Sequence, residues 1–281
     1  MILIADSGSS KTTWCLTDHA GVVKQFNTKG YNPCYPSGEP LFDILKPNLP
    51  ADFNPNEVTE VAFYGAGVYE DKYRVIEQAI QPIFPHAHID AATDLTGSAR
   101  ALLGHGSGFA AILGTGANSC LYDGTKITCQ VKPLGFLLGD EGSGAYMGKR
   151  LIVAYLRKYM PEDVRQAFEE TYRLTDAELI RQVYANPMPN SYCASFTHFL
   201  TGNMAGHEYL EGIIRNSFRD FFNNIIIHYP SYQQYTFNCA GSVGWVFRQA
   251  LTEVAQEYGM QTGNIISSPM TGLVKYHTEI V

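Results

Sequence analysis

The sequence predicts an α/β protein built from two domains that repeat one architecture. The chain has 281 residues, and at roughly 150 residues per domain this length suits two modest domains. Apolar residues make up 45% of it, which is enough for folded cores and excludes a disordered chain. Each half opens with an apolar strand, a small-residue turn containing Gly and Thr, and a second strand. Such internal similarity indicates a duplicated fold.

Charge and cysteine content narrow the class of protein. Twenty Lys and Arg stand against 27 Asp and Glu, a net charge of −7, which argues against a general nucleic-acid binder. The six scattered cysteines form no C-x-x-C pair, so we expect reduced core thiols instead of zinc ligands or disulfides. No stretch approaches the roughly 20 apolar residues of a membrane span, and no basic secretory signal opens the chain. We therefore expect a cytoplasmic protein without nucleic-acid or membrane partners.

The first half, residues 1–106, is expected to open with a three-stranded meander and to continue with alternating strands and helices. Apolar and β-branched runs predict its strands, and apolar residues at helical spacing predict its helices. The expected strands are 2–5, 13–17, 22–26, 58–64 and 88–92. The expected helices are 69–83 and 96–103, with a short one over 41–45.

The second half, residues 107–281, follows a glycine-rich boundary at 104–108 and repeats the meander. Asp123-Gly124 is a strong hairpin signal between two of its strands. The expected strands are 109–113, 119–122, 126–131, 236–240 and 264–267. Helices are expected to dominate 141–229, followed by helices over 245–258 and 270–277. The final helix, about 269–281, is expected to pack back on the first domain.

Two turns of small residues are candidate phosphate loops. The first, Asp6 to Thr12, is not a P-loop, because Ser10 precedes the lysine and a strand follows. It is either an ordinary Gly-Ser hairpin or a strand–turn–strand loop whose N–H groups donate to phosphate, with Asp6 holding Mg²⁺ through water. The second turn, 114–118, has the same pattern, and its Asn118 suits a hydroxyl-rich ligand.

Three other strings also carry two interpretations each. Asp94, after a strand, is either the N-cap of the next helix or a general base for phosphoryl transfer. Asp140 and Glu141 lie among glycines, where they favour a helix N-terminus or form a pocket floor. The Gly241-Ser242 turn either lies against an adenosine or simply packs tightly.

Taken together, these strings resemble the acetate-kinase/sugar-kinase/Hsp70/actin superfamily, and more narrowly the N-acetylglucosamine kinases and the related BadF/BadG/BcrA/BcrD ATPases. The resemblance runs nearly end to end, and its most specific part is Gly-Asp-Glu-Gly-Ser after a Gly-Thr-Gly loop. The matching strings are Asp6 to Thr12, Gly30 to Pro33, Gly65 to Gly67, Thr93-Asp94, Gly114 to Gly116, Leu138 to Ser143 and Ala240 to Val243. It implies two ribonuclease-H-like (actin-like ATPase) domains with ATP in a cleft between them.

The resemblance also assigns roles to residues of this chain. Asp6 would coordinate Mg²⁺, and Asp94 would be the catalytic base. The nucleotide would contact Gly8, Ser9, Ser10, Lys11, Thr12, Thr115, Gly116, Gly241 and Ser242. The sugar would contact Asn32, Gly67, Asp94, Asn118 and Asp140.

The activity implied is an ATP- and Mg²⁺-dependent kinase that phosphorylates the 6-hydroxyl of an amino sugar, with N-acetylglucosamine as the expected substrate. Another hexose such as glucosamine is an alternative substrate. A second alternative is an ATPase activator of a 2-hydroxyacyl-CoA dehydratase, which would need exposed cysteines for an iron–sulfur cluster shared by two subunits. A non-catalytic sugar-sensing or actin-like module is a third. The expected partner is a small-molecule sugar, and a homodimer is left open.

Overall fold

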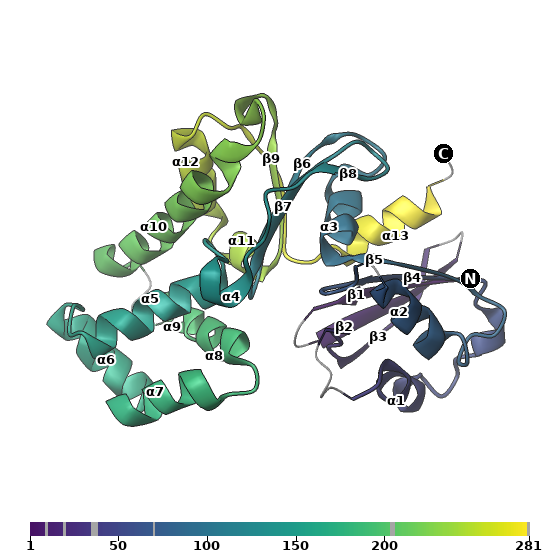
Figure 1. Ribbon diagram of the computed structural model, residues 1–281, viewed down its shortest axis with the longest axis horizontal. Helices are drawn as coiled ribbons and strands as arrows, with labels where there is room; N and C mark the ends of the chain where they lie inside the picture. The colour runs from purple at the N-terminus through teal and green to yellow at the C-terminus, as the bar shows by residue number, and fades with distance from the viewer. Residues whose placement is uncertain (9–10, 19–20, 35–38, 70, 203–205, 280–281) are drawn as a thin grey trace. The chain divides into compact units, whose positions relative to one another are not determined.

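The computed structural model describes residues 1–8, 11–18, 21–34, 39–69, 71–202 and 206–279. The chain divides into two compact units (Figure 1). Unit 1 comprises Met1–Ala110, Cys120–Thr128 and Ser268–Val281, and unit 2 comprises Ala111–Ser119 and Cys129–Ser267. Among the residues described, no helix has both the length and the apolar character needed to cross a bilayer.

The first sheet has the strand order β3-β2-β1-β4-β5. Strand β2 is antiparallel to both β1 and β3, whereas β1, β4 and β5 run parallel. The strands are β1 (Ile2–Ser7), β2 (Lys11–Asp18), β3 (Gly21–Lys29), β4 (Glu60–Gly65) and β5 (His88–Thr93). The helices of unit 1 are α1 (Leu41–Leu45), η1 (Lys46–Asn48), η2 (Pro55–Glu57), α2 (Lys72–Ile80), α3 (Asp94–Leu103) and α13 (Met270–Thr278).

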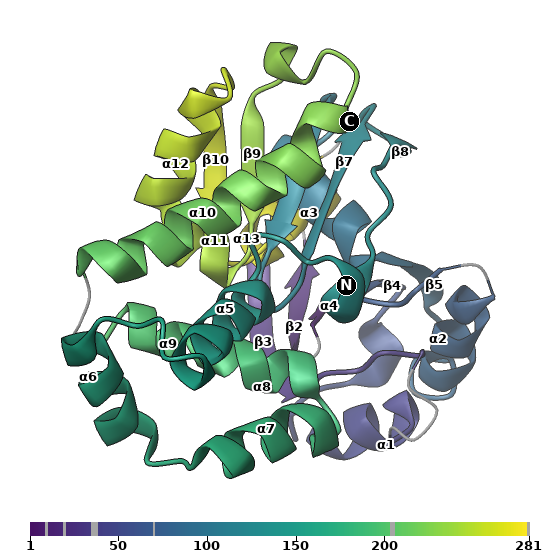
Figure 2. The ribbon, with the colours of Figure 1, turned by 60° about the vertical axis from the view of Figure 1, so that its left-hand side comes forward.

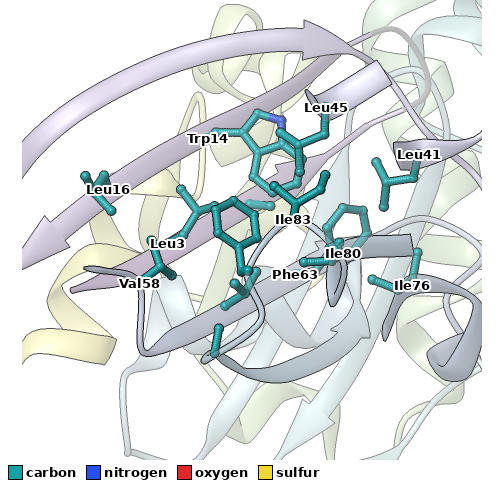
Figure 3. Close-up of a cluster of buried hydrophobic side chains, with 14 of the residues drawn as sticks. Leu3, Trp14, Leu16, Leu41, Leu45, Val58, Phe63, Ile76, Ile80 and Ile83 are labelled. Carbon is teal, nitrogen blue, oxygen red and sulfur yellow. The ribbon is translucent and has the colours of Figure 1, made fainter. Parts of the chain in front are cut away.

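Alternating side chains give this sheet two apolar faces, because successive residues of a strand point to opposite sides. Leu3 and Phe63 enter one core together with residues of α1 and α2, as Figure 3 shows. Their strand neighbours Ile4 and Ala62 enter the opposite core together with residues of α3 and α13. Both faces of the sheet are therefore covered (Figure 1), and the loops at its ends are the parts left for a ligand.

The second sheet has the order β10-β9-β6-β7-β8. Read from its other end, this is third, second, first, fourth, fifth strand, the same order as in the first sheet. The strands are β6 (Gly108–Leu113), β7 (Ala117–Tyr122), β8 (Ile127–Cys129), β9 (Phe237–Ala240) and β10 (Thr262–Ile266). The repeated architecture that the sequence predicts is confirmed.

Helices α10 and α12 cover one face of this sheet (Figure 2). Helix α5 packs against α8 and α10. The helices of unit 2 are α4 (Gly135–Leu138), α5 (Gly144–Leu156), α6 (Glu162–Tyr172), α7 (Asp176–Ala185), α8 (Pro189–Ser195), α9 (Thr197–Leu200), α10 (Glu208–Asn224), η3 (Ile226–His228), η4 (Tyr232–Gln234), α11 (Ser242–Val246) and α12 (Arg248–Glu257).

Element boundaries differ from the sequence expectations where a cap or a turn sets them. Helix α3 begins two residues before the expected 96–103, because the Thr93 side chain accepts a hydrogen bond from the N–H of Thr96. The expected helix 245–258 is two helices, α11 and α12, with Phe247 between them. The expected helix 69–83 is shorter and spans α2.

Candidate active site

The carboxyl ends of the three parallel strands of unit 1 lie in register. Ser7 pairs with Gly65, and Gly65 pairs with Thr93. Residues at or just beyond these positions therefore meet at one edge of the sheet, the place where parallel sheets usually bind ligands. This register brings Asp6, the Gly65–Gly67 segment and Asp94 to the same edge.

Two of these residues are half-buried carboxylates that interact electrostatically. Burial raises the pKa of Asp6 to about 6, the negative charge of Asp94 adds to the shift, and the Lys11 ammonium opposes it. Burial also raises the pKa of Asp94. Two carboxylates that share a partly dehydrated edge favour a bound cation or a bound proton.

Two buried hydroxyl groups stabilise the turn between β1 and β2. The hydroxyls of Ser7 and Thr12, both buried, lie 2.8 Å apart, and that of Ser7 donates to the carbonyl of Tyr31. The N–H of Gly8 donates to the carbonyl of Lys11. The hydroxyl of Thr12 therefore stabilises the conformation of the turn. Ser9 and Ser10, which the resemblance assigns to the phosphates, lie outside the described residues.

Asn32 and Gly67 contact each other beside this edge. The side chain of Asn32 accepts a hydrogen bond from the N–H of Cys34 at 2.9 Å, and the thiol of Cys34 donates to the carbonyl of Gly67 at 3.4 Å. Gly67 has a φ of +77°, and a Cβ there would lie 2.2 Å from the Asn32 oxygen. Only glycine allows the two loops to approach this closely.

Asp94 is not the helix cap that one interpretation of the sequence makes it. The N-cap is Thr93, and Asp94 is the first residue of α3, where its carboxylate accepts the N–H of Leu95 at 2.9 Å. Its negative charge still favours the helix N-terminus. Because Thr93 caps the helix, the carboxylate of Asp94 remains able to accept a proton from a ligand.

In unit 2, the 114–116 turn is bound to the start of α5. The carbonyls of Gly114 and Thr115 accept the N–H groups of Gly144 and Ala145, at 2.8 and 3.1 Å. Two N–H groups that open a helix and have no intrahelical partner are satisfied in this way. The turn is therefore fixed by its carbonyls, and its conformation depends on the Gly-Asp-Glu-Gly-Ser string that leads into α5.

Asp140 belongs to that string and lies against the turn. Its carboxylate accepts the N–H of Ala117 at 3.2 Å, and a Cβ on Gly116 would lie 3.0 Å from its Oδ2. Burial raises the pKa of Asp140, and its backbone adopts a left-handed φ of 62°. Such strain in a non-glycine residue often accompanies a functional site.

Gly241 brings a third turn to the same end of unit 2. It has a φ of +123°, and a Cβ there would lie 2.4 Å from the carbonyl of Leu113, so the turn after β9 packs directly on the end of β6. Ser242 beside it is exposed. Asn118 lies further along β7, where its side chain accepts hydrogen bonds from Ser119 and Gln130.

The structure thus brings Asp6, Lys11 and Asp94 together, pairs Asn32 with Gly67, and groups the 114–116 turn with Asp140 and Gly241. Sequence reasoning missed Ser7, whose buried hydroxyl anchors the first turn. A small polar residue at the end of an apolar strand is the signal that could have indicated it.

No model of a protein family matches the chain, and no curated protein matches it by sequence. Solved structures do match. A Porphyromonas gingivalis protein, provisionally assigned as an N-acetylglucosamine kinase, is 37% identical, with a TM-score of 0.92 over 99% of both chains. A Chromobacterium violaceum protein with the same provisional assignment is 15% identical, with a TM-score of 0.71 over 98% of both chains. A ROK hexokinase from Thermus thermophilus is 13% identical, with a TM-score of 0.53 over 98% of this chain and 97% of that one.

The two sheets of equal strand order and these matches define an α/β fold of the actin-like ATPase type. Within it, the identity of 37% over 99% of both chains is decisive. The chain belongs to the family of N-acetylglucosamine-kinase-like proteins, and the resemblance seen in the sequence is confirmed.

Proposed function

We propose that the protein is an ATP-dependent sugar kinase that phosphorylates the 6-hydroxyl of an amino sugar, with N-acetylglucosamine as the first candidate. The observation that carries the proposal is the register of β1, β4 and β5, which sets Asp6 and Asp94 at one sheet edge. The Asp6 carboxylate would bind the metal ion of the metal–nucleotide complex, and the Asp94 carboxylate would accept a proton. The names of the structural neighbours support the same class of activity.

In this proposal Asp94 is the general base. It accepts the proton of the sugar hydroxyl while that oxygen forms a bond to the γ-phosphorus, the bond from phosphorus to the bridging oxygen breaks, and ADP leaves. A carboxylate with a raised pKa is a stronger base than an ordinary one, provided that it is ionised. The sugar would also contact Asn32, Gly67, Asn118 and Asp140.

The nucleotide would contact the two small-residue turns and the Gly241-Ser242 turn. Asp6 offers carboxylate oxygens, the ligands that Mg²⁺ prefers, and a single protein carboxylate with water is a usual arrangement for that ion. When bound, Mg²⁺ would neutralise charge on the phosphates. Lys11 adds a positive charge near the same edge.

A coupled assay of ADP release tests the proposal. The sugars to compare are N-acetylglucosamine, N-acetylmannosamine, glucosamine and glucose, each with ATP and Mg²⁺. We expect ADP release that depends on at least one amino sugar, and a phosphomonoester product at its 6-position by NMR. ADP release that is equal with and without every sugar would overturn the proposal.

The alternative role as an ATPase activator is less well supported by the positions of the cysteines. Cys15, Cys120, Cys193 and Cys239 are buried, and Cys34 and Cys129 are half-buried. A cluster shared by two subunits needs accessible thiolates at a common surface. Iron bound by anaerobically purified protein would favour that alternative.

A further inference from the structure

Tyr64 lies in the core of unit 1, at the last position of β4 before Gly65. Only 1% of its surface is exposed, and it belongs to the core that α3 and α13 cover, together with Ile4 and Ala62. A tyrosine buried among apolar side chains needs a partner for its hydroxyl. Both its ring and its hydroxyl contact α3, the helix that begins with Asp94.

The ring of Tyr64 lies directly against the backbone of α3 at Gly97. A Cβ on Gly97 would lie 2.7 Å from Cγ of the ring and 2.8 Å from Cβ of Tyr64. Gly97 follows Asp94 by three residues, so the two stand on neighbouring parts of one helix face, about 4.5 Å apart along the helix axis. A movement of the helix at Gly97 is therefore passed to Asp94 within one turn.

The hydroxyl of Tyr64 is held between two side chains. It accepts a hydrogen bond from Nη1 of Arg100 at 2.8 Å and lies 2.8 Å from Nε2 of His277. A guanidinium only donates, so the hydroxyl keeps its own proton for His277, and burial raises its pKa to about 12. Arg100 lies 3.6 Å from the carboxylate of Asp90, and His277 lies 3.6 Å from that of Glu60. Since Arg100 belongs to α3 and His277 to α13, the hydroxyl joins both helices to β4 (Figure 1).

We propose that Tyr64 is a positioning residue, whose ring and hydroxyl fix α3 on the sheet and thereby set the place of the Asp94 carboxylate. Tyr64 contacts α3 at Gly97 and at Arg100, and two contacts along one helix restrict both its rotation and its sliding. The inference rests on the proposed function, in which Asp94 is the general base. A base must stay within hydrogen-bond reach of the proton that it accepts, and a displacement of about 1 Å can cost roughly 10²-fold in rate.

Gly97→Ala tests the inference, because it separates the helix from the ring and leaves Tyr64 and Asp94 in place in the sequence. Ordinary contacts of a Cβ begin at 3.4 Å, so the ring and α3 must move apart by about 0.7 Å, from 2.7 Å to 3.4 Å. We expect kcat to fall about 10- to 100-fold while the sugar KM changes little. Tyr64→Phe keeps the ring and removes the hydroxyl, and it should lower kcat roughly fivefold, the effect of one hydrogen bond.

Ile76→Val is the matched control for a loss of stability. Ile76 is buried in the core on the other face of the sheet, and removing one of its methylene groups should lower the melting temperature. We expect the kcat of folded Ile76→Val to equal that of the wild type.

A double-mutant cycle with Asp94→Asn shows whether the effect of Gly97→Ala passes through the base. We expect Gly97→Ala to lower the kcat of the wild type and to leave the residual kcat of Asp94→Asn unchanged. Equal factors of loss in the two backgrounds would overturn the inference and leave the proposed function intact. So would a wild-type kcat in both Gly97→Ala and Tyr64→Phe. ADP release by the wild type that is the same with and without every sugar would overturn the proposed function and the inference with it.

Discussion

Asp6 and Asp94 interact electrostatically at the carboxyl edge of the first sheet. Burial raises the pKa of Asp6 to about 6, and the negative charge of Asp94 contributes to this increase. The two residues belong to β1 and to the start of α3 after β5, and β4 lies between these strands. Keeping two like charges close together at a partly buried edge costs stability. Proteins accept such a cost mainly where a ligand relieves it.

Asp6→Asn should stabilise the nucleotide-free protein at pH 8. The folded pKa of about 6 lies above the ordinary value of 3.8, so Asp6 favours folding while protonated, and this contribution disappears as pH rises through about 6. The difference of about 2 pH units corresponds to roughly 3 kcal/mol at most. Thermal unfolding followed by tryptophan fluorescence should show the gain at pH 8 and not at pH 4.

The same variant should lose the stabilisation that Mg²⁺–ADP gives the wild type. A ligand at 100 times its Kd adds about 2.7 kcal/mol to the folded state, and we expect most of this to vanish when the metal-binding carboxylate is replaced. Equal Mg²⁺–ADP stabilisation of Asp6→Asn and the wild type would show that Asp6 does not serve the nucleotide.

Gly67→Ala should impair sugar use more than Gly104→Ala does. Both glycines have positive φ, but a Cβ at Gly67 would lie 2.2 Å from the Asn32 oxygen, whereas nothing lies within 4 Å of one at Gly104. Both variants should lose about 1–3 kcal/mol of unfolding free energy through backbone strain. Only Gly67→Ala should also displace Asn32. The sugar KM, measured at saturating ATP, should rise for Gly67→Ala alone. An equal rise of the sugar KM in both variants would show that Asn32 does not contact the sugar.

Gly116→Ala and Gly114→Ala form a second matched pair. A Cβ on Gly116 would lie 3.0 Å from the Asp140 carboxylate, and one on Gly114 meets nothing within 4 Å. We expect Gly116→Ala to displace Asp140 from the N–H of Ala117 and to weaken nucleotide binding roughly five- to tenfold, the effect of one hydrogen bond. Gly114→Ala should bind nucleotide as the wild type does. Equal ADP affinities of the two variants by calorimetry would contradict a role for this contact.

Local patterns in the sequence account for much of the fold, because each apolar strand and each small-residue turn carries its own signal. The repeat that these signals form predicts two similar domains, whereas the strand order of the two sheets is seen only in the structure. Contacts between distant segments carry no such signal. The bond from Ala117 to Asp140 joins residues 23 positions apart, and the inward-facing hydroxyl of Thr12 depends on Lys29 and Ser7. The cap at Thr93 was missed because two adjacent residues were both suitable N-caps.

The most direct test of the account is the turnover of Asp94→Asn with the sugar that the ADP-release assay identifies. Thr93 still caps α3 in this variant, so its melting temperature should not fall below that of the wild type. Thr93→Ala, the control for helix stability, should instead lose about 1 kcal/mol of unfolding free energy. Asparagine cannot accept the hydroxyl proton, and general-base assistance is typically worth about 10²–10⁴-fold. The account predicts that kcat falls by this factor while the sugar KM changes little. An unchanged kcat for folded Asp94→Asn would contradict it.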